Sequence, residues 1–277
     1  MLELSRTVRF SLSDGRPTGG RCEPAATPRA NTYAAWPAMR GLGRYYELDI
    51  LCRGDADPAT GYFINIKHID RAVWDQVLPY LESLIADPTG DPADAPLGEV
   101  LRRSLVLLEE PLDNRVAAVT LRLTPTYAIS LEEADMSTVT VRQQYDFAAA
   151  HRLHVPELSD EANRQTFGKC NNPAGHGHNY RVEVAVAATI DPNGHVFDVE
   201  ELDEIVDAAM IEQLDHKHLN EDVPAFADRN PTVEHIAQVV WGLLAPEVGK
   251  LGHVDDARLV EVSVWETEKT RCVYRGD

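Results

Sequence analysis

The sequence predicts an α+β protein of two similar halves, each folding as two strands, two helices and two strands, with the helices on one face of an antiparallel sheet. First, residues 41–73 resemble residues 175–206: both begin Gly-x-Gly, alternate apolar and polar residues, and turn at Asp-Pro before a helix with a charged start. Second, similar strands flank both segments. Third, a helix with one apolar face follows each. The predicted domains are residues 1–134 and 135–277.

Each half begins with a predicted strand, residues 8–13 in the first and 140–150 in the second. A β-hairpin leading into a helix comes next. The second helix of each half is predicted from apolar residues at helical spacing: Leu97, Val100, Leu101, Leu105 and Leu108, and then Val233, Ile236, Ala237, Trp241 and Leu244. We expect Asn230, before Pro231, to cap the later helix. Strands at 119–124 and 262–267 follow.

The two halves differ at the residues able to carry chemistry. His176 and His178 align with Leu42 and Arg44, and Glu266 aligns with Leu123. The first half keeps the folding pattern without these reactive side chains. It is therefore predicted to be a scaffold with no metal site.

Composition limits the partners. The formal net charge is −19, with 26 Lys and Arg against 45 Asp and Glu, which argues against nucleic acid as a general partner. No apolar run is long enough to cross a bilayer, and the start lacks a signal layout, so we expect a cytoplasmic protein with no membrane partner. Four scattered cysteines form no C-x-x-C pair, so free thiols are expected.

Three histidines predict a metal site. If residues 177–186 form a strand, its period of two places His176 and His178 side by side at the end of an apolar face. His151, near the end of the preceding predicted strand, supplies a third imidazole. Three histidine ligands with an open fourth position are typical of catalytic zinc. The alternative is that these histidines are hydrogen-bonded strand residues.

Cys170 lies in the loop between these histidines, next to Lys169. A nearby cation lowers the pKa of a thiol, giving a thiolate that acts as nucleophile or base. Alternatively, Cys170 is an inert thiol or a fourth zinc ligand, and the latter would prevent catalysis.

Two further features suggest proton transfer and ligand recognition. Asp215 precedes His216, and a histidine held by a carboxylate is a common proton-relay unit, although a solvated helix end is an alternative and His218 competes for the role. Glu266 continues an apolar strand face, where its oxygens could accept hydrogen bonds from an amino-substituted ring. Otherwise Glu266 is a solvent-exposed carboxylate.

These motifs together resemble the 6-pyruvoyl-tetrahydropterin synthase family, which includes the 6-carboxytetrahydropterin synthases of deazaguanine (queuosine) biosynthesis. The motifs are F-A-A-A-H-R-L, F-G-K-C-N-N-P-A-G-H-G-H-N-Y, L-D-H-K-H-L-N, N-P-T-V-E and V-W-E-T. The resemblance covers residues 139–274 closely and the first half only as a degenerate copy. It implies two tandem tunnelling-fold (ββααββ) domains that assemble into barrels.

The resemblance also implies roles for individual residues. His151, His176 and His178 would hold Zn²⁺, and Cys170 would be the general base. Asp215 and His216 would be its relay, Glu266 the anchor of the pterin ring, and Thr232 and Glu234 part of that pocket. Lys169, Arg152 or Lys217 would receive the triphosphate.

The implied reaction is a carbon–oxygen lyase reaction that converts 7,8-dihydroneopterin triphosphate to 6-pyruvoyl-tetrahydropterin with elimination of triphosphate. The five residues between Cys170 and His176 favour this product. One alternative is 6-carboxytetrahydropterin synthase, which releases acetaldehyde. Another is a non-catalytic pterin-binding or assembly protein.

The tandem arrangement has a consequence for assembly. In the family that the chain resembles, the relay reaches the thiol of a neighbouring subunit. If the two halves alternated around a ring, Asp215 and His216 would face a copy without a thiol. We therefore predict a homo-oligomer in which second domains contact second domains.

Overall fold

The computed structural model of the protein describes residues 1–12, 36–37, 43–87, 90–252 and 257–276. The chain divides into two compact units, Met1–Thr140 with Thr189–Val196, and Val141–Ala188 with Phe197–Asp277. The division lies near, but not at, the expected boundary between residues 134 and 135. The turn at 189–196 belongs to the first unit because the Ile190 amide donates to the Ser137 carbonyl (2.8 Å) and the Glu99 amide donates to the Gly194 carbonyl (3.0 Å).

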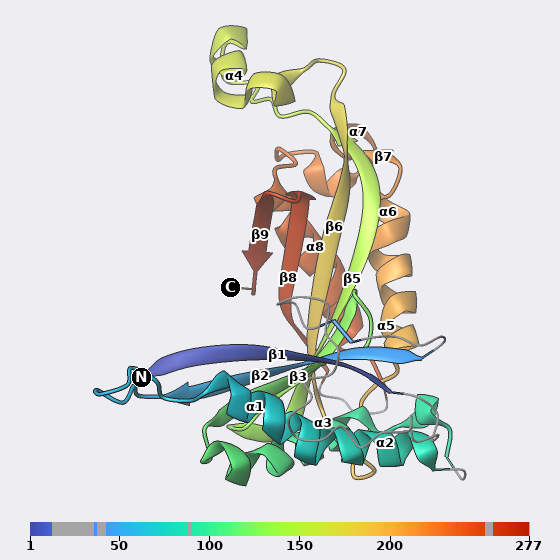
Figure 1. Ribbon diagram of the computed structural model, residues 1–277. Coiled ribbons are helices and arrows are strands. Elements are labelled where there is room, and N and C mark those ends of the chain that lie inside the picture. Colours follow the sequence, from blue (N-terminus) through green and yellow to red (C-terminus); the bar gives the residue numbers. More distant parts are fainter. Residues whose placement is uncertain (13–35, 38–42, 88–89, 253–256, 277) are drawn as a thin grey trace. The chain divides into compact units, whose positions relative to one another are not determined.

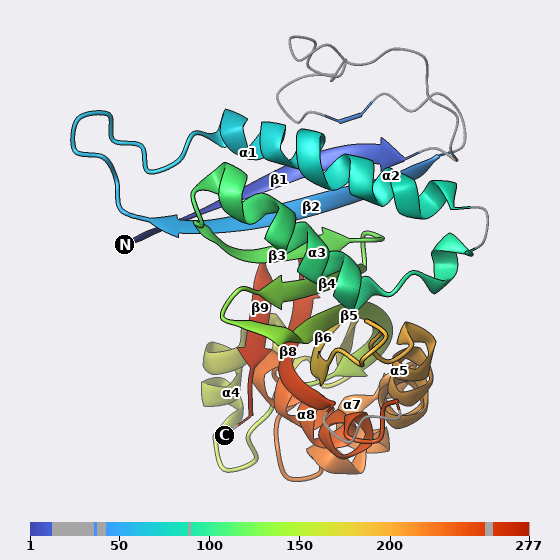
Figure 2. The ribbon, with the colours of Figure 1, turned by 90° about the horizontal axis from the view of Figure 1, so that it is seen from below.

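The first unit is an antiparallel sheet with helices on one face, as Figure 2 shows. Its strands are β1 (Leu2–Leu12), β2 (Arg44–Gly54), β3 (Val116–Arg122) and β4 (Tyr127–Glu132), and β4 pairs with the start of β5 (Asp135–His151). Its helices are α1 (Ile66–Ala72), the π-helix η1 (Val73–Val77), α2 (Leu78–Ala86), the short η2 (Pro92–Asp94), α3 (Leu97–Glu109) and η3 (Glu110–Leu112).

The second unit repeats this class of architecture (Figure 1). The strand order is β5, β6 (His176–Thr189), β8 (Arg258–Thr267) and β9 (Thr270–Tyr274), and β7 (Lys217–His218) lies parallel to β5. The helices are α4 (Asp160–Phe167), η4 (Gly168–Asn171), α5 (Val199–Val206), the π-helix η5 (Asp207–Ile211), α6 (Glu212–Leu214), α7 (Leu219–Asp222), η6 (Pro224–Phe226) and α8 (Val233–Val248). Both units are thus α+β.

The core of the second unit lies between the sheet and α8. Apolar side chains of β6 and β8 alternate with polar ones, and those facing α8 are fully buried. The buried set is Val182, Val184, Val186, Val262 and Val264 on the strands and Ile236, Ala237, Val240 and Leu244 on α8. Burying each of these larger aliphatic side chains stabilises the fold by about 1.5–3 kcal/mol. The predicted alternation along β6 and the helical spacing of α3 and α8 are confirmed.

Two local features occur at similar places in both units. The rings of Phe10 on β1 and Tyr46 on β2 lie 6.1 Å apart, and those of Phe147 on β5 and Tyr180 on β6 lie 5.0 Å apart. Each unit also has a five-residue π-helix that directly follows an α-helix, η1 after α1 and η5 after α5.

Two local predictions are wrong. Residues 61–65 and 190–198 contain no returning strand. Two backbone bonds close each turn instead: Asp57 bonds with Tyr62 and Gly61 in the first, and Asp191 bonds with His195 and Gly194 in the second. The helix α8 is capped by Thr232 rather than Asn230, because the Asn230 side chain accepts a hydrogen bond from the His154 amide. No helix among the described residues combines the length and apolarity that a membrane span requires.

Candidate metal centre and active site

Three imidazoles meet where β5 ends and β6 begins. His151 is the last residue of β5, and His176 and His178 open β6. One ligand nitrogen from each lies within 4.8 Å of the others, and the Nε2 atoms of His151 and His176 are 3.1 Å apart. His151 is fully buried. The predicted grouping of these three residues is therefore present in the structure.

Backbone contacts fix the orientation of this cluster. The Nδ1 of His151 donates a hydrogen bond to the carbonyl of Pro231 (2.7 Å), just before α8, so its Nε2 faces the other histidines. The hydroxyl of Tyr180 lies 3.4 Å from the same Nδ1. Orientation of a ligating histidine by a carbonyl on its other nitrogen is usual at metal sites. The sequence did not indicate Pro231, because its contribution is a backbone oxygen that no side-chain pattern marks.

The donor atoms fit a metal ion. Nε2 of His178, which faces the other two histidines, is buried and has no hydrogen-bond partner. Unsatisfied buried polar atoms cost about 1–3 kcal/mol each, a cost that coordination would remove. Burial, opposed by the bond to Pro231 and reinforced by the neighbouring histidines, lowers the pKa of His151 to about 4. Neutral imidazole is the form that binds metal.

Glu266 of β8 lies beside the cluster. Its Oε1 is 3.5 Å from the Nε2 of both His151 and His178, and its side chain is 22% exposed. The Glu266 carboxylate is therefore partly buried beside the histidines. It lies neither in the core nor in the solvent outside the site. Its position leaves part of the carboxylate open to a ligand next to the histidines.

Cys170 lies in η4, a single turn that follows α4. Its carbonyl accepts a hydrogen bond from the Leu153 amide (2.8 Å), which ties the turn to the segment after β5. The thiol is partly buried. Burial, followed by the negative charge of Glu266, raises the pKa of Cys170. The expected lowering by a cation is therefore wrong for the protein alone, since Lys169 is exposed and Glu266 has the opposite sign.

Asp215 and His216 form a hydrogen-bonded pair. Asp215 Oδ2 lies 2.6 Å from His216 Nδ1, and Oδ1 accepts a bond from the Ala148 amide (2.8 Å). The Ala148 bond, with His216 second, lowers the pKa of Asp215. The His216 side chain is 83% exposed. Among the described residues no hydrogen bond joins this pair to Cys170 of the same chain.

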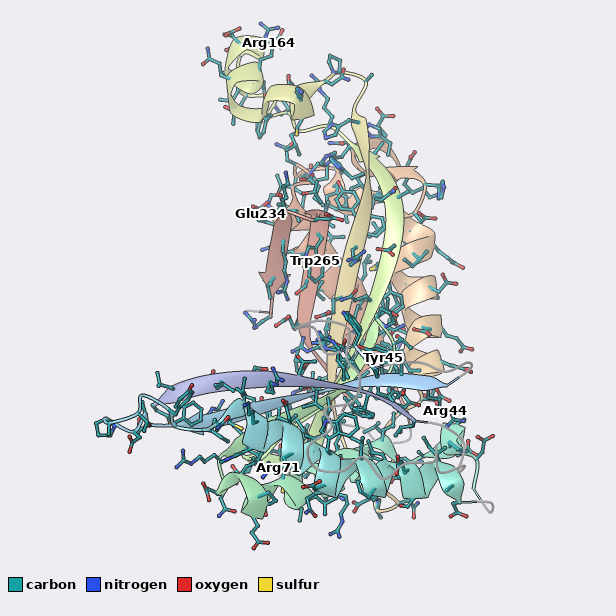
Figure 3. The ribbon with its side chains drawn as sticks, viewed as in Figure 1. Arg44, Tyr45, Arg71, Arg164, Glu234 and Trp265 are labelled. Atoms are coloured by element: carbon teal, nitrogen blue, oxygen red, sulfur yellow. The ribbon has the colours of Figure 1, made fainter. Side chains whose placement is uncertain are left out.

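The other predicted pocket residues lie at the start of α8. Thr232 caps the helix, and the exposed Glu234 is in its first turn. Hydrogen bonds from its own amide and from Thr232 lower the pKa of Glu234. Its charge, after burial, contributes to the raised pKa of Cys272 on β9, so Glu234 lies near that strand (Figure 3). Thr232 is connected to the cluster through the adjacent Pro231, whose carbonyl bonds to His151.

Gly175 and His218 complete the local framework. Gly175 has φ +68°, and a Cβ there would lie 2.8 Å from His218 Nε2 and 3.1 Å from the His151 carbonyl oxygen. The turn before His176 therefore packs tightly against His218. His218 is also the second residue of β7 and pairs with Ala150 of β5. The sequence indicated His218 as an alternative to His216 in the proton relay. It did not indicate that His218 packs against Gly175.

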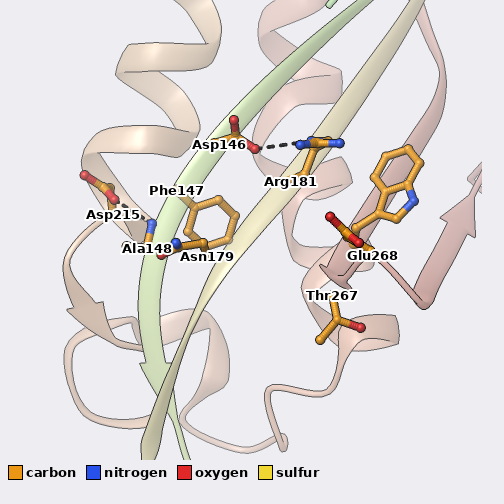
Figure 4. Close-up of a pocket in the computed structure, with 9 residues that line it drawn as sticks. Asp146, Phe147, Ala148, Asn179, Arg181, Asp215, Thr267 and Glu268 are labelled. Atoms are coloured by element: carbon orange, nitrogen blue, oxygen red, sulfur yellow. Dashed lines mark hydrogen bonds and ion pairs between the residues drawn. The ribbon is translucent and has the colours of Figure 1, made fainter.

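Two depressions lie near the cluster in the second unit. One, of about 440 Å³, is lined by Asp146, Phe147, Ala148, Asn179, Arg181, Asp215, Trp265, Thr267 and Glu268 (Figure 4). The other, of about 520 Å³, is lined by Ala148, Ala149, Ala150, Gly177, His178, Asn179, His216, Lys217 and His218. They share Ala148 and Asn179, and the second reaches the cluster through His178.

Comparisons with known proteins cover the second half of the chain. A family model described as 6-pyruvoyl tetrahydropterin synthase matches residues 139–277. The human 6-pyruvoyl tetrahydrobiopterin synthase is 44% identical over 138 residues, which cover 50% of this chain and 91% of the human protein. A solved structure of 6-pyruvoyl tetrahydropterin synthase from Caenorhabditis elegans is 35% identical, with a TM-score of 0.45, and the match covers 50% of this chain and 96% of that one. A putative 6-carboxy-5,6,7,8-tetrahydropterin synthase from Archaeoglobus fulgidus is 36% identical over 70 residues, or 25% of this chain and 56% of that protein.

Proposed function

Because the chain belongs to the 6-pyruvoyl tetrahydropterin synthase family, we propose that its second half is a zinc-dependent lyase that converts 7,8-dihydroneopterin triphosphate to 6-pyruvoyl-tetrahydropterin. The observation that carries this proposal is the cluster of His151, His176 and His178, in which the buried Nε2 of His178 has no hydrogen-bond partner. A zinc ion held by these residues would supply Lewis-acid polarisation of the substrate's side-chain oxygens.

The chain's own residues perform the proton transfer and the recognition. The Cys170 thiolate takes a proton from a carbon of the substrate side chain, and the C–O bond to the triphosphate breaks with its electron pair leaving on the triphosphate oxygen. Internal redox tautomerisation completes the product. Glu266 accepts hydrogen bonds from the amino-substituted pterin ring, which it can reach through its open side. Thr232 and Glu234 extend that pocket from the start of α8.

The relay completes the site from another copy of the chain. Asp215 and His216 are hydrogen-bonded to each other, His216 is exposed, and neither has a bond to Cys170 of its own chain among the described residues. This supports a homo-oligomer in which second halves contact second halves, so that the pair of one copy meets the thiol of the next. The first half serves as a scaffold.

The similarity to a 6-carboxy synthase favours one second candidate. In that reaction the side chain is cleaved and acetaldehyde is released. Mass spectrometry of the products from 7,8-dihydroneopterin triphosphate, with an assay for acetaldehyde, separates the two activities.

The variant Cys170→Ala tests the lyase itself. We expect bound zinc at the level of the unsubstituted chain and turnover reduced by a factor of about 10²–10⁴, the usual contribution of a general base. His151→Ala should lose the metal, whereas His195→Ala, at an exposed turn residue outside the cluster, should keep both metal and turnover. Metal content is measured by elemental analysis of the purified chains.

Other outcomes would identify a different protein. Loss of zinc in Cys170→Ala would make Cys170 a fourth ligand of a structural site. A zinc-loaded chain that turns over no dihydropterin triphosphate would be a pterin-binding or assembly protein. Purified chain without metal would contradict the proposal as a whole.

A further inference from the structure

The two depressions of the second unit differ in charge although they adjoin. The one in Figure 4 carries three carboxylates, Asp146, Asp215 and Glu268, against one cation, Arg181, which is already paired with Asp146 (3.4 Å). The other, here called the donor pocket, is lined by residues 148–150, 177–179 and 216–218 and contains no carboxylate. Its polar side chains are Lys217, Asn179 and three imidazoles.

A pocket without carboxylates is notable in this chain. The formal net charge is −19, so most of the surface repels a polyanion. Ammonium, amide and imidazole N–H groups are the donors that bind phosphate oxygens, and the bonds from charged groups are the stronger ones. Lys217 and Asn179 are both exposed, and Lys217 forms no ion pair with any of the described residues. Their donors are free to meet a ligand.

The donor pocket also lies next to the proposed metal site. His178 belongs to both, and His218 packs against Gly175, the residue before His176. Pairing of β7 with β5 places Lys217 opposite Ala149, two residues before His151. A substrate whose side chain reaches the histidines would therefore bring the attached triphosphate to this pocket. Of the three cations expected to bind it, Lys217 lines this pocket, whereas Lys169 and Arg152 line neither depression.

We propose that the donor pocket is the triphosphate subsite, with Lys217 as its principal cation and Asn179 and His218 as further donors. The assignment rests on the proposed lyase function for the identity of the ligand. When the C–O bond breaks, its electron pair remains on the triphosphate oxygen. Lys217 then lies beside the increased negative charge, which it stabilises.

Inorganic triphosphate is the probe that tests this subsite. Its binding to the full-length chain is measured by isothermal titration calorimetry, with zinc and after removal of metal, because triphosphate also binds metal ions. Lys217→Gln should weaken binding at least tenfold in both states, and Lys217→Arg should restore most of it. Lys250→Gln removes one lysine charge at a surface pair with Glu247 and should change binding less than twofold.

Three results would overturn the assignment. They are unchanged affinity in Lys217→Gln, loss of binding in Lys169→Gln instead, and no binding to the unsubstituted chain. The outcome is separable from that of the lyase proposal. If the chain binds triphosphate through Lys217 but turns over no pterin substrate, the subsite assignment holds and the lyase proposal is wrong. If the chain is active but Lys217→Gln changes nothing, the lyase proposal holds and the subsite assignment is wrong.

Discussion

At the scale of single residues, the site depends on backbone atoms as much as on side chains. The Pro231 carbonyl selects which nitrogen of His151 faces the cluster, and the Ala148 amide holds the Asp215 carboxylate. Both contacts are made by main-chain groups, Ala148 on β5 and Pro231 just before α8. A site anchored in this way keeps its geometry when exposed side chains around it change.

Gly175 allows the closest approach in this framework, so Gly175→Ala should disturb the metal site. The left-handed φ of +68° costs an L residue about 1–2 kcal/mol, and the contacts with His218 and the His151 carbonyl add about 1–3 kcal/mol of overpacking. We expect a lower melting temperature and weaker zinc binding in competition with a chelator.

Gly61→Ala is the matched control for that substitution. Gly61 has φ +75°, but a Cβ there meets no atom within 4 Å. This variant should show only the backbone cost and no change in zinc affinity. Equal zinc affinities in the two variants would show that the packing of Gly175 against His218 does not hold the ligands.

At the scale of elements, the segment from β5 to β6 is organised by one buried amide. Asn163 of α4 is fully buried; its Oδ1 accepts from the Val155 amide (2.8 Å), and its Nδ2 donates to the carbonyls of Val155 (2.9 Å) and Leu158 (3.1 Å). These bonds fold the chain back on itself before η4. The turn that carries Cys170 is thus positioned by polar contacts more than by an apolar core.

Asn163→Ala should loosen this segment and displace the thiol. Removing the amide removes its hydrogen bonds to the Val155 and Leu158 backbone, each worth about 0.5–1.5 kcal/mol. We expect turnover to fall at least tenfold while zinc content stays constant, because the histidines lie on β5 and β6. Gln165→Ala, at an exposed residue of the same helix whose side chain bonds to Glu161, should behave like the unsubstituted chain. Zinc loss in Asn163→Ala would show that α4 supports the ligands directly.

The sequence predicted the elements whose apolar side chains recur at a regular spacing. It did not predict features that depend on the local backbone conformation or on contacts between residues distant in sequence. Alternation along β6 placed His176 and His178 on one face, and the helical spacing located α3 and α8. The cap of α8 was misplaced because Asn230 and Thr232 both suit that role, and a contact with His154, distant in sequence, chose between them. The π-helices η1 and η5 left no signal, since their residues also suit an α-helix.

At the scale of the whole molecule, we propose that the chain is a tandem of two related units. Support comes from their common order of strands and helices, from the Phe–Tyr ring pairs on their first two strands, and from the π-helix at the same place in each. A π-helix within an α-helix is rare, so its recurrence favours common ancestry over chance. The family match begins at residue 139, so it covers the second unit and not most of the first.

Mixing two inactive variants tests the proposed contact between second halves. Cys170→Ala lacks the thiol, and His216→Ala lacks the relay. If each site combines the thiol of one copy with the relay of another, co-expressed variants should regain roughly a quarter of the original turnover, since random assembly leaves that share of sites intact. Because the described part of the first unit provides no such thiol and relay, recovery requires second halves to meet.

The control for this mixture is the double variant. Cys170→Ala co-expressed with the chain carrying both Cys170→Ala and His216→Ala contains no thiol at position 170 and should stay inactive at every ratio. If the complementary mixture is equally inactive although mass measurement shows mixed oligomers, then the relay serves the thiol of its own chain. In that case Asp215 and His216 must move toward Cys170 when substrate binds, since no hydrogen bond links them among the residues described.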